Sequence, residues 1–217
     1  MTEESAQTLE RHFRQTLVPA FRAAGFVGSR RNFRKIRPGW AIALNIQGGA
    51  LGRVFAINIG IHPLGLPDTM EQMVDPKKIM HWQCQFSSRL GPGCSDFWFS
   101  HRSSEATISS AVARATAMFA DVGEPFIRRW AGENSPLLTV SPDEFSRDEL
   151  DFEGLADTKI HRALLLARLR FLHDDFEAAA EFARQGLNLP SAIFNYRVAR
   201  NLEQVLERAI AQLNSGV

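Results

Sequence analysis

The stretch Trp40–His62, WAIALNIQGGALGRVFAINIGIH, decides the fold of this chain of 217 residues. Two apolar segments flank a loop that carries Gly48, Gly49 and Gly52, which is typical of a β-hairpin with a longer loop. Because side chains alternate between the two faces of a strand, each segment divides into two sets. One face of the hairpin is large and branched, with Trp40, Ile42, Leu44, Ile46, Phe55, Ile57, Ile59 and Ile61. The other face combines alanines and Gly60 with Asn45, Gln47, Asn58 and His62.

Segments on both sides of the hairpin predict the rest of a sheet and helices to cover its large face. Residues 31–37 have the pattern of a strand before the hairpin, and residues 82–89 and 96–101 have the pattern of two strands after it. Strands with short connections pair antiparallel, so we expect one antiparallel sheet of about five strands. Residues 6–24 carry apolar side chains at helical spacing, with a kink expected at Pro19, and a later segment repeats that spacing. The predicted fold class is therefore α+β.

The C-terminal part of the chain predicts helices only. Apolar side chains at helical spacing indicate helices at about 158–172, 175–187 and 192–213. In the last of these helices, the residues from Phe194 to Leu213 predict a buried stripe. We therefore expect an α-helical C-terminal region after the sheet.

Composition places a boundary between these two regions. Residues 132–157 combine glycine and prolines with a run of acidic residues, as connecting segments often do. We expect a sheet domain at 1–131, an acidic connecting segment at 132–157, and a helical region at 158–217. The helical stripes are too apolar to be left in water, so we expect the helical region to dock on the sheet domain.

The net charge of +1 conceals an uneven distribution of charge along the chain. Residues 1–66 hold nine Lys/Arg and three Asp/Glu, whereas residues 67–217 hold 16 and 21. No apolar run approaches the roughly 18 residues of a membrane-spanning helix. The N-terminus lacks the basic and apolar regions of a secretory signal, so we expect a cytoplasmic protein with its two cysteines reduced.

Short motifs in the first half of the chain follow one another in a familiar order. They are GFVGSRRNFRKIRPGWAIALNIQ from Gly25, FAINIGIHP from Phe55, and SRLG from Ser88, with Cys84 before the last. In this order they resemble the bacterial family known as domain of unknown function 4304, over roughly residues 10–130. The family name supplies no activity, so the resemblance implies no catalytic residues.

A pair of C-terminal helices resembles one tetratricopeptide unit. The resemblance rests on the spacing of large and small residues at Leu166, Ala167, Ala179, Gly186 and Leu187. Arg170 departs from the aromatic residue usual there, and Ala183 is smaller than usual. An independent solenoid needs about three units, so this pair is not expected to form a peptide groove by itself.

The cysteines and histidines raise the questions of a metal site and a catalytic nucleophile. His81 and Cys84, with Cys94 and His101 downstream, are residue types that zinc accepts. The spacing after Cys94 is loose and Cys84 falls within an apparent strand, so we predict no metal and no cofactor. Cys94 as a nucleophile would need a base such as His62, and no known signature surrounds it. We therefore predict no catalytic residue.

Five cations crowd the segment before the hairpin: Arg30, Arg31, Arg34, Lys35 and Arg37. One interpretation is a surface for anions or for a partner. The other is that charges on an edge strand discourage pairing with another chain, and the strand period divides these charges between both faces. Because the whole-chain charge is near zero, we expect this segment to meet an acidic protein surface rather than nucleic acid.

The polar residues on the small face of the hairpin also allow two interpretations. Asn45, Gln47, Asn58 and His62 have alanines and a glycine around them, which leaves room for a shallow ligand site. Alternatively, this face is solvated, or helices pack on its small residues.

The sequence favours a non-enzymatic binding or protein-interaction module, because polar residues suited to recognition occur without a catalytic constellation. The alternative is a small-ligand binder or an enzyme that uses the sheet face around Asn45, Asn58 and His62. A buried pocket that contains His62 favours the alternative, and a flat charged surface favours the first. The expected partner is another protein, with no membrane involved, and the oligomeric state is left open.

Overall fold

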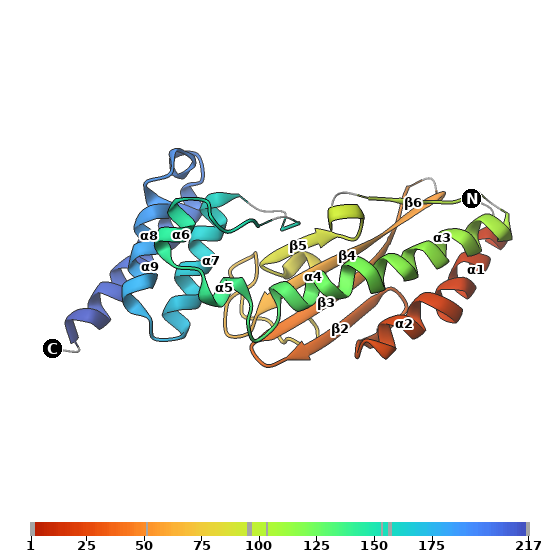
Figure 1. The fold of residues 1–217 in the computed structure, drawn as a ribbon, viewed down its shortest axis with the longest axis horizontal. Coiled ribbons are helices and arrows are strands. Elements are labelled where there is room, and N and C mark those ends of the chain that lie inside the picture. The colour runs from red at the N-terminus through yellow and green to blue at the C-terminus, as the bar shows by residue number, and fades with distance from the viewer. Residues whose placement is uncertain are drawn as a thin grey trace. The chain divides into compact units, whose positions relative to one another are not determined.

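The structure is a computed structural model that describes residues 3–50, 52–94, 97–102, 104–152, 154–155 and 158–215. Within it the chain forms two compact units (Figure 1). The first unit comprises Met1–Glu133 with Glu153–Leu155, and the second comprises Asn134–Phe152 with Ala156–Val217.

An antiparallel sheet is the frame of the first unit. Its strands are β1 (Val27–Ser29), β2 (Asn32–Arg37), β3 (Trp40–Gly48), β4 (Val54–Pro63), β5 (Phe86–Arg89) and β6 (Phe99–Ser100). The strands pair in the order β1-β2-β3-β4-β5, and β6 pairs with β4 further along the edge that β5 occupies. The α+β fold and the antiparallel sheet predicted from the sequence are confirmed.

Two interrupted helices cover the large face of this sheet. The first consists of α1 (Glu3–His12), the π-turn η1 (Phe13–Leu17) and α2 (Val18–Ala23). The second consists of α3 (Glu105–Met118), the π-turn η4 (Phe119–Gly123) and α4 (Glu124–Trp130), and α3 lies beside α1 (Figure 1). A proline lacks an N–H and its ring crowds the carbonyl four residues earlier, which for Pro19 and Pro125 falls inside each π-turn. The π-turns therefore accommodate the prolines without ending either helix.

Aromatic side chains join the two helices to the sheet. The ring of Phe13 packs edge-on against Phe55 at 4.9 Å between centroids, and Phe21 contacts Phe33 at 5.2 Å and Phe119 at 4.7 Å. The branched residues of the hairpin are buried under this layer, as the alternating pattern predicts.

Residues 64–85, here called the covering segment, cover the part of the small face around Ala41, Ala43, Gly60 and His62. Ala41 and Ala43 of β3 form a buried cluster with Ile79 and Cys84 of that segment. The strand predicted at 82–89 begins only at Phe86, because the chain before it crosses the small face as the 3₁₀ turn η2 (His81–Gln83). The strand predicted at 96–101 is also shorter, since β6 begins at Phe99 and residues 95–96 lie outside the described residues.

The second unit is helical. Its helices are α5 (Pro136–Thr139), α6 (Pro142–Ser146), α7 (Lys159–Leu172), α8 (Phe176–Leu187), the 3₁₀ turn η5 (Pro190–Ile193) and α9 (Tyr196–Ser215). A Cβ atom at Gly186 would lie 2.8 Å from both Ala163 Cβ and Leu202 Cδ1, so α8 approaches α7 and α9 closely where that side chain is absent. No helix among the described residues is both long and apolar enough to cross a bilayer.

The contacts of Arg170 explain why an arginine stands where a tetratricopeptide unit usually has an aromatic residue. Its buried guanidinium donates hydrogen bonds to the carbonyl oxygens of Leu137 at 3.2 Å and Val140 at 2.6 Å. The same group lies 5.6 Å from the ring centroid of Phe182. Arg170 therefore fixes the end of α5 to α7 and α8. An aromatic side chain could not donate these hydrogen bonds.

The predicted buried stripe of the last helix is wrong at both ends. Val198, Leu202 and Val205 are buried within it, but Phe194 is 87% exposed and Leu213 is 36% exposed. Phe194 precedes α9, so the helical period that places its neighbours does not apply to it.

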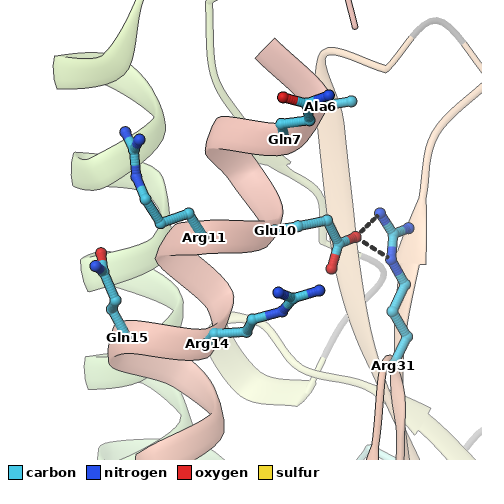
Figure 2. A pocket seen from close by; sticks show the side chains of 7 residues that line it. All are labelled: Ala6, Gln7, Glu10, Arg11, Arg14, Gln15 and Arg31. Atoms are coloured by element: carbon cyan, nitrogen blue, oxygen red, sulfur yellow. Dashed lines mark hydrogen bonds and ion pairs between the residues drawn. The ribbon is translucent and has the colours of Figure 1, made fainter. Parts of the chain in front are cut away.

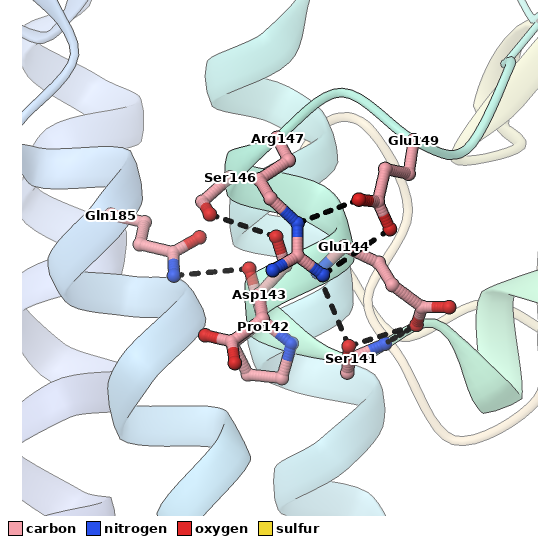
Figure 3. Close-up of polar contacts among 8 residues, drawn as sticks. All are labelled: Ser141, Pro142, Asp143, Glu144, Ser146, Arg147, Glu149 and Gln185. Carbon is pink, nitrogen blue, oxygen red and sulfur yellow. Dashed lines mark hydrogen bonds and ion pairs between the residues drawn. The ribbon is translucent and has the colours of Figure 1, made fainter.

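Part of the acidic segment packs within the helical unit (Figure 3). Ser141 caps α6 by accepting a hydrogen bond from the Glu144 amide at 3.2 Å, while the Glu144 carboxylate accepts one from the Ser141 amide at 2.7 Å. Gln185 of α8 donates to the carbonyl oxygen of Pro142 at 3.1 Å, and Arg147 pairs with Glu149 at 2.7 Å (Figure 3). Docking of the helical region on the sheet domain stays a prediction.

Candidate functional site

A row of polar side chains crosses four strands on the part of the small face that the covering segment leaves open. The strand register aligns Asn32 of β2 with Asn45 of β3, Asn45 with Asn58 of β4, and Asn58 with Arg89 of β5. Gln47 lies two positions beyond Asn45 on the same strand and face. We call these five residues the amide row.

Hydrogen bonds run along the amide row in one direction. Arg89 Nε donates to Asn58 Oδ1 at 3.1 Å, Asn58 Nδ2 donates to Asn45 Oδ1 at 3.3 Å, and Asn45 Nδ2 donates to Asn32 Oδ1 at 2.9 Å. The oxygen of Gln47 accepts from Asn58 at 2.9 Å and from Arg89 at 3.3 Å. The side-chain amide oxygens are therefore used inside the row. Within the described residues, the side-chain nitrogens of Gln47 and Asn32 form no hydrogen bond.

Trp98 extends the row with an aromatic surface. The guanidinium of Arg89 lies 4.5 Å from the centroid of the Trp98 ring, a cation–π distance. Trp98 rests beside Gly49, where a Cβ atom would lie 3.6 Å from the ring. Arg89 is thus held from two sides, by the amides and by the indole.

The accessibility of these side chains suits recognition. Asn58, at the centre of the row, is only 5% exposed, while Asn45, Arg89 and Trp98 are half-buried and Gln47 is exposed. The buried centre fixes the geometry and the outer members can reach a partner. Arginine and tryptophan are also enriched among the residues that dominate protein interfaces.

His62 is separated from the amide row, although it lies on the same face of β4. Gly60 stands between them, and a Cβ atom there would lie 2.6 Å from Cys84 Sγ and 2.8 Å from His81 Cα. His62 is 2% exposed, and its Nε2 donates to the Leu66 carbonyl oxygen at 3.1 Å. The structure therefore brings Asn45, Gln47 and Asn58 together and places His62 under the covering segment.

Burial controls the protonation of His62. Loss of solvent lowers the pKa of His62, and this outweighs the Leu66 carbonyl and the Asp68 carboxylate, which both raise it. Nδ1 of His62 is buried without a hydrogen-bond partner in the described part of the chain. A neutral imidazole with one donated hydrogen bond matches these surroundings.

Asp68 anchors the covering segment. Its Oδ1 accepts hydrogen bonds from the amides of Met70 at 2.8 Å and Gln72 at 2.9 Å, and its Oδ2 accepts one from Gln83 at 3.1 Å. Burial raises the pKa of Asp68, but the hydrogen bonds together with the nearby His62 lower it by more, so the pKa lies below its ordinary value. An ionised Asp68 thus holds both ends of the loop that covers His62.

The five cations before the hairpin do not gather on one surface. Arg34 lies on the small face, where its Nε donates to the carbonyl oxygen of Ile79 at 2.6 Å. Lys35 lies on the opposite face and donates to the carbonyl oxygen of Ala24 at 2.5 Å, at the end of α2. Both side chains therefore bind backbone carbonyls, and the division between faces follows the strand period.

The remaining three cations lie at the two ends of β2. Arg30 is exposed in the turn before it, with a φ of 55°, and Arg37 is half-buried at its end. Arg31 pairs with Glu10 of α1, its Nε lying 2.8 Å from Glu10 Oε1. Arg31 thus joins the turn before β2 to a carboxylate of the first helix.

Arg31 and the polar side of the first helix border an open hollow of about 520 Å³ (Figure 2). It is lined by Ala6, Gln7, Glu10, Arg11, Arg14, Gln15 and Arg31. Arg11 and Arg14 are not among the site residues predicted from the sequence. The signal that could have found them is their position opposite the apolar stripe of the same helix.

Cys84 is not placed for nucleophilic chemistry. Cys84 is buried, its thiol lies 3.5 Å from the Met80 carbonyl oxygen, and burial raises the pKa of Cys84 well above its ordinary value. The Cys94 side chain lies outside the described residues. Among the residues that the structure describes, no group of three or more His, Cys, Asp and Glu could hold a metal ion.

Comparison with known proteins gives one family and no activity. A family model described as Domain of unknown function (DUF4304) matches residues 17–129, more than half of the chain. The matched residues contain β1 to β6 and therefore the whole amide row. No curated protein and no solved structure matches the chain.

Proposed function

Since this chain belongs to the DUF4304 family, whose description assigns no activity, we propose from its own residues that it is a non-enzymatic binding module for another protein. Its recognition surface is the amide row together with Trp98. The proposal includes a bacterial source and a cytoplasmic location. The buried thiol of Cys84 suits a reducing compartment.

The observation that carries the proposal is the alignment of the amide row across β2, β3, β4 and β5. Neighbouring strands lie about 4.8 Å apart, so the row extends about 14 Å. Its hydrogen bonds fix the side chains before a partner arrives, which reduces the entropy lost on binding. The nitrogens of Gln47 and Asn32 can then donate to carbonyl or carboxylate oxygens of that partner.

The position of His62 favours binding over the enzymatic alternative. A general acid or base has to come within hydrogen-bond reach of its substrate. His62 is buried beneath the covering segment, and Gly60 and Cys84 separate it from the amides. The open part of the face offers hydrogen-bond donors and an aromatic surface, which suit recognition.

The test compares proteins that co-purify with tagged variants from native cells. Gln47→Ala removes an exposed member of the row, and Gln204→Ala is the matched control because it changes an exposed glutamine of α9. We expect one protein to be enriched with the wild type and with Gln204→Ala and to be lost with Gln47→Ala. Equal recovery of every protein by all three chains would contradict the proposal.

A further inference from the structure

The hollow beside the first helix has an excess of positive charge. Its lining holds three arginines and one glutamate, a net charge of +2 (Figure 2). Arg11 is paired outside the lining, with Glu105 of α3 at 2.7 Å. Arg31 is paired with Glu10, so the charge that remains unmatched inside the hollow is that of Arg14.

Arg31 is held in place by three neighbours. Glu10 Oε1 accepts hydrogen bonds from both Nε and Nη2 of Arg31. The guanidinium lies 5.8 Å from the Phe13 ring centroid, and a Cβ atom at Gly48 would come within 3.0 Å of Nη1. Glycine at that position leaves the room that the guanidinium occupies.

Arg14 is the arginine of the lining whose charge has no partner among the described residues. It is exposed, and it forms no hydrogen bond or ion pair with any described residue. Figure 2 shows its guanidinium directed toward the Glu10–Arg31 pair, while the side chains of Arg11 and Gln15 extend from the other side of the helix. A guanidinium aimed at a charged pair in a hollow provides the donors of an anion site.

We propose that this hollow binds a phosphorylated small molecule. Guanidinium groups pair with phosphate through two parallel hydrogen bonds, and a phosphate ester carries about −1.5 to −2 charges at pH 7, opposite in sign to the net +1 of Arg14, Arg31 and Glu10. The volume of about 520 Å³ falls within the range of small-molecule sites, roughly 300–1,000 Å³. It therefore has room for an organic part, next to Ala6 and the amides of Gln7 and Gln15.

Glu10 sets the selectivity of the proposed site. Its carboxylate repels any anion, so a bound group must gain from two guanidinium groups at once. A single phosphate group presents three oxygens that Arg14 and Arg31 can share, whereas a dicarboxylate has to place a separate carboxylate on each guanidinium. We therefore expect phosphate esters to bind more tightly than dicarboxylates of the same charge.

The test is calorimetric titration of the full chain with glycerol 3-phosphate at low salt, with glycerol and malonate as matched probes. Arg14→Gln removes the uncommitted charge, and Arg114→Gln makes the same change at an exposed position of α3 outside the hollow. We expect saturable binding of glycerol 3-phosphate to the wild type and to Arg114→Gln, and about tenfold weaker binding to Arg14→Gln. Addition of salt should weaken the binding.

Three results would overturn the inference. They are no saturable binding of glycerol 3-phosphate, equal binding of malonate, and equal affinity of the two arginine variants. Tighter binding of a single-stranded oligonucleotide that also depends on Arg14 would make the hollow part of a nucleic-acid surface instead. The amide row contributes no residue to the hollow, so the outcome is separate from that of the proposed function.

Discussion

Gly60→Ala tests how the covering segment lies on the sheet. The added methyl group would lie 2.6 Å from Cys84 Sγ and 2.8 Å from both Cα and the carbonyl oxygen of His81. Atoms in van der Waals contact are about 3.5–4 Å apart, so a gap of about 1 Å has to open. Two of the three crowded atoms belong to the backbone, which cannot rotate away as a side-chain end can.

The expected cost follows from that geometry. Overpacking that shifts backbone costs about 1–3 kcal/mol. With a urea m-value of about 2 kcal/mol/M, the unfolding midpoint should fall by about 0.5–1.5 M. Gly48→Ala is the matched control, because its methyl group would meet only the end of the Arg31 side chain, at 3.0 Å, and should cost less than about 0.5 kcal/mol.

Tryptophan fluorescence during urea unfolding is the assay. All four tryptophans lie in the first unit, so the signal follows the sheet unit and not the helical one: Trp40, Trp82, Trp98 and Trp130. A Gly60→Ala midpoint equal to that of the wild type would mean that the covering segment does not lie against β4 at this position.

Three further predictions concern the cores of the two units. Ile57→Ala should destabilise the sheet unit by about 2–5 kcal/mol, because the side chain is fully buried; an unchanged urea midpoint would mean that the faces of β4 are reversed. The pKa values of His62 and Asp68 lie below their ordinary 6.5 and 3.8, so both groups bind protons more readily in the unfolded chain. Their contribution to the stability of the sheet unit should be complete above pH 6.5, then fall through His62 and at lower pH through Asp68, and a urea midpoint that rises on acidification would contradict this. Arg170→Met should cost the helical unit about 2–4 kcal/mol, because the carbonyl oxygen of Leu137 loses its buried donor; amide exchange that stays unchanged across α7 would speak against it.

The sequence predicted the hairpin well because strand periodicity is a local signal. The alternation that separates Ile57 from Asn58 is set by the backbone of one strand, so it can be read without knowing any neighbour. The same rule divided Arg34 from Lys35 correctly between the faces of the sheet.

What the sequence could not predict depends on contacts between distant segments. Arg89 completes the amide row only because β5 pairs with β4 in one register, and nothing in its own surroundings along the chain specifies that pairing. The strand period places His62 on the same face as the amides, but residues 64–85 have no regular period that would show them folding over it. The hollow combines Arg31 with Arg14, which lies on another element.

The limits of periodicity are clearest at the end of the chain. Phe194 continues the spacing of the buried residues in α9, yet the helix begins after it, at Tyr196. A stripe predicted from spacing alone has no information about where the helix starts.

Site-specific photocrosslinking in native cells tests whether the amide row is the surface that binds a partner. The photoreactive residue p-benzoylphenylalanine replaces Gln47 at the exposed edge of the amide row in one chain, and replaces Gln204 of α9 in a control chain. We expect a discrete protein adduct from position 47 and none from position 204. An adduct that forms only at position 204, or no protein adduct at position 47, would contradict the claim that the amide row is the surface that binds a partner.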